Sequence, residues 1–134
     1  MESFDTAEFE EAWVEGEASA GWRSATAHGP GTGAAASGSS LLEIDPGRRL
    51  PRHTDSAEET IVVVTGAALV SIAEQRERIV AGGIAVVPAG VPHEVANRGE
   101  ELLRFAAVYA GTDVVTTYEQ PVQPDGGTTR RPVA

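Results

Sequence analysis

Two short stretches in the middle of the chain decide its fold. Residues 47–66 read GRRLPRHTDSAEETIVVVTG, and residues 82–97 read GGIAVVPAGVPHEVAN. Each stretch holds an apolar, mostly β-branched run, residues 61–64 in the first and 84–87 in the second, as β-strands prefer. Glycines and prolines that favour tight turns flank both runs. The pattern predicts short antiparallel strands that are joined by turns.

Four side chains of metal-binding types lie in these two stretches. His53 and Asp55 are two residues apart, so an extended strand points both of them to the same face. Glu59 follows after a short turn, and His93 follows the proline-rich turn at residues 88–92. Two imidazoles with one or two carboxylates suit Fe(II), Mn, Zn, Ni or Co better than Cu(I), and two histidines with one carboxylate is the pattern of non-haem Fe(II) oxygenases.

Together the two stretches resemble the paired consensus motifs of the cupin superfamily, over residues 41–110. The resemblance implies an all-β fold, a single-domain cupin barrel (a double-stranded β-helix or jelly roll). The chain departs from the family at Asp55, where the usual His-x-His pair has its second histidine. The framework residues that match are Gly47, Gly66, Gly82, Pro88, Gly90, Pro92 and Asn97. We expect the glycines to permit turns, the prolines to stiffen the loop before His93, and Asn97 to hold a turn.

The resemblance also implies one divalent transition metal per chain, with Fe(II) favoured and Mn, Ni, Zn or Co as alternatives. Its ligands would be His53, Asp55, Glu59 and His93. Two interpretations of Asp55 stay open, because its side chain is shorter than that of histidine: a direct ligand, or a residue that contacts the metal through water or hydrogen-bonds a ligand. The layout is further similar to the small single-domain bacterial cupins described as quercetin-dioxygenase-like.

The rest of the chain predicts three segments. Residues 1–40 are expected to form an acidic N-terminal helix or arm and a glycine-rich loop, residues 41–120 the cupin barrel, and residues 121–134 a flexible tail. Asp5 with a glutamate three residues later resembles a capping box, which predicts a short helix that ends near Gly16. The alternative is an acidic arm that orders only against a neighbour.

Composition limits the classes of function. A chain of 134 residues can bury one core, and the absence of cysteine excludes disulfides and thiolate metal sites. The net charge of −10 disfavours nucleic acid and anionic membranes as partners. The acidic first residues do not resemble a signal peptide, and no apolar run approaches the roughly 18 residues of a membrane span. We therefore expect a cytoplasmic protein.

The candidate catalytic groups are Glu59, as a base, and Tyr109, as a proton donor. Arg52 and Arg104 are the candidate contacts to an anionic substrate. Arg104 interrupts the apolar run at residues 102–110, where strict alternation leaves either face free to point inward. The outward position is favoured for Arg104, because an unpaired buried arginine is rare.

Three classes of function follow from the resemblance. The first is a metal-dependent enzyme that acts on a small organic substrate, with dioxygenase-type oxidation favoured. The second is a non-redox metal-dependent isomerase, cyclase or lyase, and the third is a binding or sensor protein without turnover. A homodimer is expected, since cupin barrels commonly pair through their sheets. Trp13 and Trp22 are expected to cover an open end of the barrel or a dimer contact.

Overall fold

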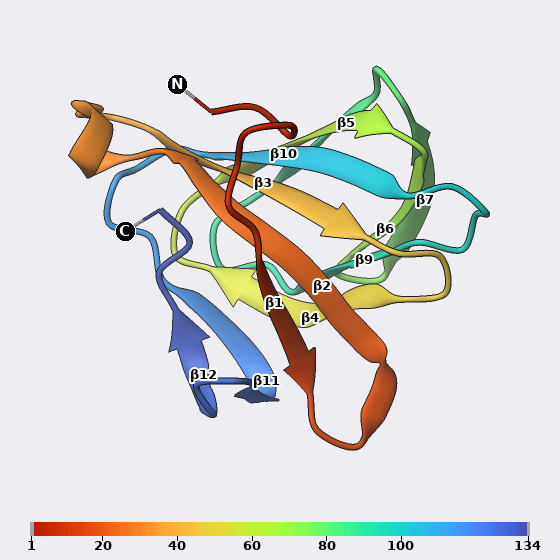
Figure 1. The fold of residues 1–134 in the computed structure, drawn as a ribbon. Helices are drawn as coiled ribbons and strands as arrows, with labels where there is room; N and C mark the ends of the chain where they lie inside the picture. The colour runs from red at the N-terminus through yellow and green to blue at the C-terminus, as the bar shows by residue number, and fades with distance from the viewer. Residues whose placement is uncertain (1, 134) are drawn as a thin grey trace.

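The computed structural model describes residues 2–133 and shows two β-sheets that face each other and form a barrel (Figure 1). The first sheet has the order β1-β2-β3-β10-β5-β8, with the bounds β1 Glu10–Val14, β2 Glu17–His28, β3 Gly38–Ile44, β10 Leu103–Tyr109, β5 Glu59–Thr65 and β8 Ile84–Val87. The second has the order β12-β11-β4-β9-β6-β7, with the bounds β12 Gly127–Arg130, β11 Thr116–Val122, β4 Arg49–Asp55, β9 His93–Ala96, β6 Ala67–Ile72 and β7 Gln75–Val80. The all-β prediction is confirmed.

The hydrophobic core lies between the two sheets, and β10 shows how the alternation is resolved. Leu103, Phe105, Ala107 and Tyr109 are all buried in the barrel. Arg104 therefore points outward, where its Nε donates to Glu43 at 2.7 Å. The sequence allowed either face of this strand to point inward. The face without the arginine does so, because the charged side chain pairs with a carboxylate on the outer face.

The expectation of a short N-terminal helix is wrong. Within residues 2–133 the only helical segment is a 3-10 turn at Pro30–Thr32, and no helix there is long and apolar enough to cross a membrane. Residues 10–14 form β1 instead, which pairs with β2. Ala12 and Val14 are buried while Trp13 points outward, so the apolar pattern has the period of a strand. The backbone of this segment hydrogen-bonds to the edge of β2, and this pairing outweighs the local signals for a helix.

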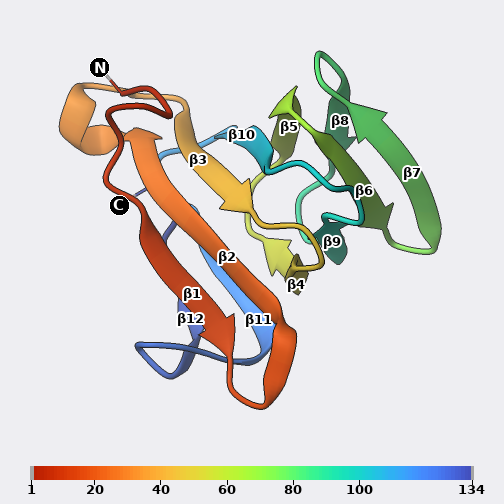
Figure 2. The same cartoon turned by 45° about the vertical axis from the view of Figure 1, so that its right-hand side comes forward.

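The two ends of the chain also join the barrel, beyond the bounds expected for it. Figure 2 shows β1 and β2 running along one side of the molecule, with β11 and β12 behind them. After β12, the carbonyl of Pro132 accepts hydrogen bonds from Thr26 and Ser40. Val133 is buried against the backbone of β3 at Gly38. The C-terminal segment, expected to be a flexible tail, therefore packs on the first sheet.

Asn97 ties together the loops at the end of β9, in line with the structural role expected of it. Its Nδ2 donates to the carbonyls of Ile44 and Glu101, both at 2.8 Å, and its Oδ1 accepts from the Gly99 amide at 3.0 Å. Asn97→Ala leaves these buried groups unpaired, so we expect the free energy of unfolding to fall by about 2 kcal/mol in urea titrations. Its exposed neighbour gives the control, Arg98→Ala, which should be silent; equal stability of the two variants would contradict this role.

Candidate metal centre

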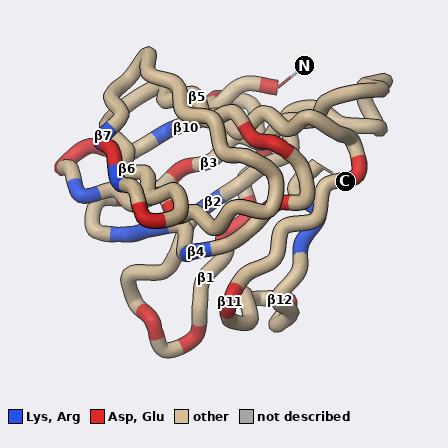
Figure 3. Tube along the Cα trace, turned by 180° about the vertical axis from the view of Figure 1, so that it is seen from behind, with Lys and Arg blue, Asp and Glu red and all other residues tan. Residues whose placement is uncertain are grey.

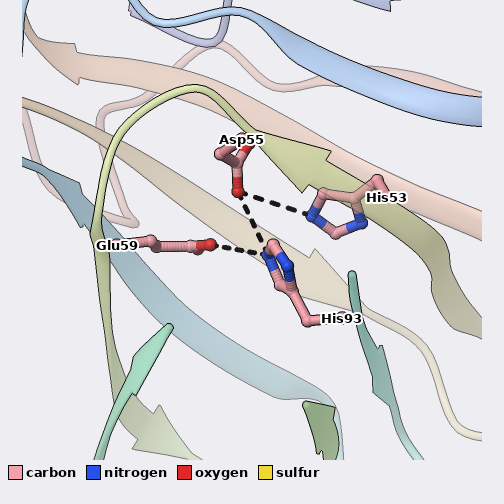
Figure 4. Close-up of side chains that lie close together, drawn as sticks. All are labelled: His53, Asp55, Glu59 and His93. Atoms are coloured by element: carbon pink, nitrogen blue, oxygen red, sulfur yellow. Dashed lines mark hydrogen bonds and ion pairs between the residues drawn. The ribbon is translucent and has the colours of Figure 1, made fainter. Parts of the chain in front are cut away.

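Four buried side chains converge inside the barrel: His53, Asp55, Glu59 and His93 (Figure 4). We call them the quartet. His53 and Asp55 come from the end of β4, whereas Glu59 begins β5 and His93 begins β9. Each residue offers one nitrogen or oxygen, and these four atoms all lie within 4.8 Å of one another. The structure therefore brings together the four residues that the sequence proposed as ligands, and they can hold a metal ion.

Strand register and one tight turn position the quartet. His53 lies directly opposite His93 in the β4–β9 pair, with ring centroids 4.1 Å apart. Asp55 points to the same face as His53, because alternate residues of a strand share a face. Gly90, in the turn before His93, has a φ of 76° and donates its amide to the carbonyl of Asp55 at 2.8 Å. This bond fixes the loop that presents His93 to the end of β4, and the positive φ explains the need for glycine.

Backbone contacts set the tautomers of both histidines. The Nδ1 of His53 lies 2.7 Å from the carbonyl of Pro51, and the Nδ1 of His93 lies 2.9 Å from the carbonyl of Val91. A carbonyl only accepts, so each Nδ1 must carry the hydrogen. The Nε2 atoms are left to face the quartet, in the arrangement by which metal-binding histidines are usually held.

Asp55 has one oxygen that is held and one that lacks a hydrogen bond. Its Oδ1 accepts a hydrogen bond from the Thr116 hydroxyl at 2.6 Å. Its Oδ2 is buried and has no hydrogen-bond partner among residues 2–133, although it lies 3.1 Å from the Nε2 of His93 and 3.9 Å from that of His53. A buried carboxylate oxygen is costly without a partner, so this atom is placed where a cation would satisfy it.

Burial and mutual contact shift the pKa of every quartet residue. Burial lowers the pKa of His53 to about 4, and the nearby charge of His93 adds to this, so His53 is neutral at pH 7. Burial raises the pKa of Glu59 to about 7. Burial acts to lower the pKa of His93, but its close contact with the Asp55 carboxylate and its hydrogen bond to Glu59 outweigh burial and raise the pKa to about 10. Burial acts to raise the pKa of Asp55, yet its close contact with His93 lowers it.

These contacts concentrate two carboxylates around one protonated nitrogen. The Nε2 of His93 lies 2.8 Å from Glu59 Oε1 and beside the free oxygen of Asp55. A divalent cation in place of that proton would restore charge balance to the buried cluster. Metal bonds to histidine and carboxylate are about 2.0–2.2 Å long, so ligand atoms within 4.8 Å of one another can share one ion. The donor set fits a borderline-to-hard divalent transition metal.

A cavity of about 310 Å³ opens beside the quartet and is lined by His53 and Glu59. Two aromatic side chains form part of its wall: Trp22 stacks on Tyr118 with ring centroids 5.4 Å apart, and Tyr118 in turn lies 5.2 Å from the ring of His53. Tyr109 also lines the cavity, directly opposite Glu59 in the β5–β10 pair. The cavity is therefore bordered by part of the quartet and by three aromatic side chains, and it is large enough for a small molecule.

Of the other predicted site residues, one lines the cavity and two do not. Tyr109 lies in the cavity, where burial raises the pKa of its phenol well above 10, so it is a neutral hydrogen-bond donor at pH 7. Arg52 and Arg104 do not line this cavity. Arg52 lies near Glu119, with its Nε 3.8 Å from that carboxylate, and Arg104 points to the outer face. The basic side chains that do line the cavity are Arg130 and Arg131.

Several residues that line the cavity were not predicted as site residues from the sequence. Each of them lies outside the two motifs. Trp22, which was expected to cover an open end of the barrel or a dimer contact, lies on β2 and lines the cavity beside the quartet. Thr116 and Tyr118 lie on β11, within the range expected for the barrel, but no site role was predicted for them. Arg130 lies in a glycine- and proline-rich segment that indicates a loop. Only the tertiary fold brings these segments to the site.

Comparison with known proteins gives one family and a set of structural neighbours. The model of the family described as "Cupin domain" matches residues 40–109. No curated protein matches the chain. A Lactobacillus farciminis oxalate decarboxylase in complex with formate superposes with a TM-score of 0.67 at 22% identity, over 81% of this chain and 32% of that one. The chain thus spans about a third of that enzyme.

Two shorter proteins also match. A putative sugar phosphate isomerase from Acidithiobacillus ferrooxidans has a TM-score of 0.56 at 22% identity, over 72% of this chain and 65% of that one. An RmlC-like cupin family protein from Methanocaldococcus jannaschii, with a double-stranded β-helix fold, has a TM-score of 0.56 at 19% identity, over 59% of this chain and 73% of that one. At these identities the likeness concerns the fold alone.

Proposed function

This chain belongs to the cupin-domain family, and we propose that it is an enzyme that uses one divalent transition metal to transform a small organic substrate. The observation that carries the proposal is the buried quartet, in which the free oxygen of Asp55 and the Nε2 atoms of both histidines face one point beside a cavity. The fold itself serves many reactions, so the argument depends on the site. In this proposal Asp55 stands where the family has its second histidine.

The protein's own groups would bind, orient and shield the substrate. A metal held by the quartet would act as a Lewis acid and, if it is Fe(II), could also supply electrons to dioxygen. His53 is neutral at pH 7, as a ligand must be. Trp22 and Tyr118 would exclude water from the substrate, and Tyr109 would donate a proton or hydrogen bond at the end of the cavity near Glu59.

We favour dioxygenase-type oxidation, as in the quercetin-dioxygenase-like cupins that the sequence resembles, with Fe(II) as the metal. The alternative is a non-redox isomerase, cyclase or lyase, which the neutral phenol of Tyr109 opposite Glu59 supports as an acid–base pair. A binding or sensor role without turnover is the third hypothesis. Oxygen uptake with Fe(II)-loaded protein and a flavonol or diketone would favour the first. Turnover with Zn or Mn but without oxygen uptake would favour the second.

Metal content is the experiment that tests the proposal. Protein purified without chelator should hold about one transition metal per chain by mass spectrometry, and anaerobic titration of stripped protein with Fe(II), Mn, Zn and Ni should reach the same stoichiometry. A chain that neither carries metal nor binds any of these four ions would overturn the proposal. It would leave the ligand-binding role, to be screened with metal-free protein.

A homodimer remains a prediction, and we place its interface on the outer face of the first sheet. Val86 and Val108 both lie opposite Thr60, so they share this face with Ile84, and Ile84 is 62% exposed at the edge strand β8. Light scattering should give about twice the 13.9 kDa of one chain, and Ile84→Lys should lower that mass by placing a charge in the interface. The mass of a single chain for the wild type would contradict the prediction.

A further inference from the structure

One arginine from the C-terminal end of the chain lies in the wall of the metal-site cavity. Arg130, the last residue of β12, lines the cavity together with His53 and Glu59. Its Nε is buried and has no hydrogen-bond partner among residues 2–133. Figure 3 shows the basic segment on β12 (blue) close to the C-terminal end. The side chain as a whole is 21% exposed, but a buried N–H donor without a partner is costly unless something binds it.

Strand register places Arg130 over the quartet. Asp55 on β4 lies directly opposite Thr116 on β11, and Thr116 lies directly opposite Arg130 on β12. Residues opposite each other in antiparallel strands point to the same face. Asp55, Thr116 and Arg130 therefore form a row on the inner face, with the arginine two strand spacings, roughly 10 Å, from the aspartate. A small molecule in the cavity can reach both ends of this row.

The partners that Arg130 already has leave part of its guanidinium free. One terminal nitrogen donates to the carbonyl of Gln123 at 3.2 Å. The same nitrogen lies 3.7 Å from Asp125, whose side chain is 79% exposed, and ion pairs with such exposed carboxylates stabilise little. Since arginine carries five N–H donors in a fork that matches a carboxylate, Arg130 retains the capacity to bind an anion.

The other charged groups around the cavity limit the anion to a small negative charge. Arg131 also lines the cavity, but its guanidinium is paired with Asp113. Glu8 and Glu10 line the cavity as exposed side chains. A single free guanidinium near two carboxylates, in a chain of net charge −10, suits a monoanionic group better than a phosphate dianion. A volume of about 310 Å³ lies at the small end of ligand cavities.

We propose that the substrate is a small organic carboxylate, whose carboxylate binds Arg130 while the rest of the molecule extends to the quartet. This inference rests on the proposed function for the role of the quartet, but the anion contact depends on Arg130 alone. Trp22 and Tyr118 would cover the apolar part of the molecule, since both line the space between. Arg130 is then the residue that selects acids over neutral analogues of the same shape.

The test compares benzoate, its neutral isostere benzamide, and phenyl phosphate as probes. Each is titrated by NMR into the full chain, both zinc-loaded and metal-free. Benzoate should bind the wild type more tightly than the other two probes, and Arg130→Gln should weaken benzoate binding about tenfold or more. Arg130→Lys should retain part of the affinity, because it keeps the charge but not the fork. The matched control is Arg131→Gln, which should bind benzoate as the wild type does.

The outcomes separate this proposal from that of the metal enzyme. Equal benzoate affinity in wild type and Arg130→Gln, or benzamide binding as tightly as benzoate, would overturn the role of Arg130. Tighter binding of phenyl phosphate would overturn the carboxylate and point to a phosphate ester. Metal content should be unchanged in every variant. If the wild type binds no metal, the proposed function fails, while the metal-free titration still decides whether Arg130 binds the carboxylate.

Discussion

The variant His93→Ala should lose nearly all of its bound metal. His93 contacts both carboxylates of the quartet: its Nε2 lies 2.8 Å from Glu59 and 3.1 Å from Asp55. Its removal takes away one ligand and also the group that holds both carboxylates in place. Loss of a residue that merely orients a ligand weakens metal binding by about 10- to 100-fold, so we expect at least about 100-fold here. Mass spectrometry of the purified variant and anaerobic titration of the stripped protein measure the loss.

The third histidine of the chain provides the matched control. His28 hydrogen-bonds Ser39 and Ser37 at the end of β2 and does not line the metal-site cavity. His28→Ala should keep the metal stoichiometry of the wild type. Alanine at position 93 removes the imidazole that lies between two buried carboxylates. His93→Gln should therefore be measured beside it, since glutamine keeps more of the volume and a donor. If His93→Ala and His53→Ala both retain one metal per chain, the ligand assignment is wrong.

Local sequence was sufficient to predict short antiparallel strands, whereas the cupin barrel and the full set of candidate ligands came from the resemblance. His53 and Asp55 could be assigned to one face from spacing alone, because a strand has a period of two. The arrival of Glu59 and His93 at the same point depended on the resemblance, since it is made by tertiary structure. Pairing of β4 with β9 brings His93 to His53, while Glu59 comes from β5 in the other sheet. The resemblance could not decide what Asp55 does, which depends on its bond to Thr116.

The ends of the chain could not be predicted in the same way. Asp5 and the acidic residues after it carry the local signals of a helix. The pairing of residues 10–14 with the edge of β2 cannot be predicted from local pattern. The residues after Val122 are rich in glycine and proline, and such composition describes a turn without saying where it lies. Arg130 enters the cavity only because β12 pairs back on β11. Arg52 and Arg104, the arginines proposed from the sequence as substrate contacts, do not line the cavity.

The variant Asp55→Asn should bind Mn and Fe(II) at least about 100-fold more weakly than the wild type, because loss of a residue that only orients a ligand already costs about 10- to 100-fold. Asparagine keeps the shape of aspartate, and its carbonyl oxygen can still accept the bond from Thr116. In the wild type the atom that faces the histidines is Oδ2, which has no hydrogen-bond partner among residues 2–133. In the variant an NH₂ group takes its place, and this group cannot coordinate a cation. The size of the loss separates the two interpretations of Asp55. A direct ligand should lose at least about 100-fold, whereas an aspartate that contacts the metal through water or hydrogen-bonds a ligand should lose about 10- to 100-fold.

Two companion variants sharpen the comparison. Thr116→Val keeps the carboxylate but removes the hydrogen bond that orients it, so its loss of affinity should be smaller, about tenfold. Asp55→His should still bind metal, with a preference moved toward Zn and Ni over Mn, because a neutral imidazole replaces a hard, charged oxygen. Metal-free Asp55→Asn should melt no lower than the wild type, since one of two adjacent buried carboxylates is neutralised. Unchanged Mn affinity in Asp55→Asn would show that Asp55 is not a ligand.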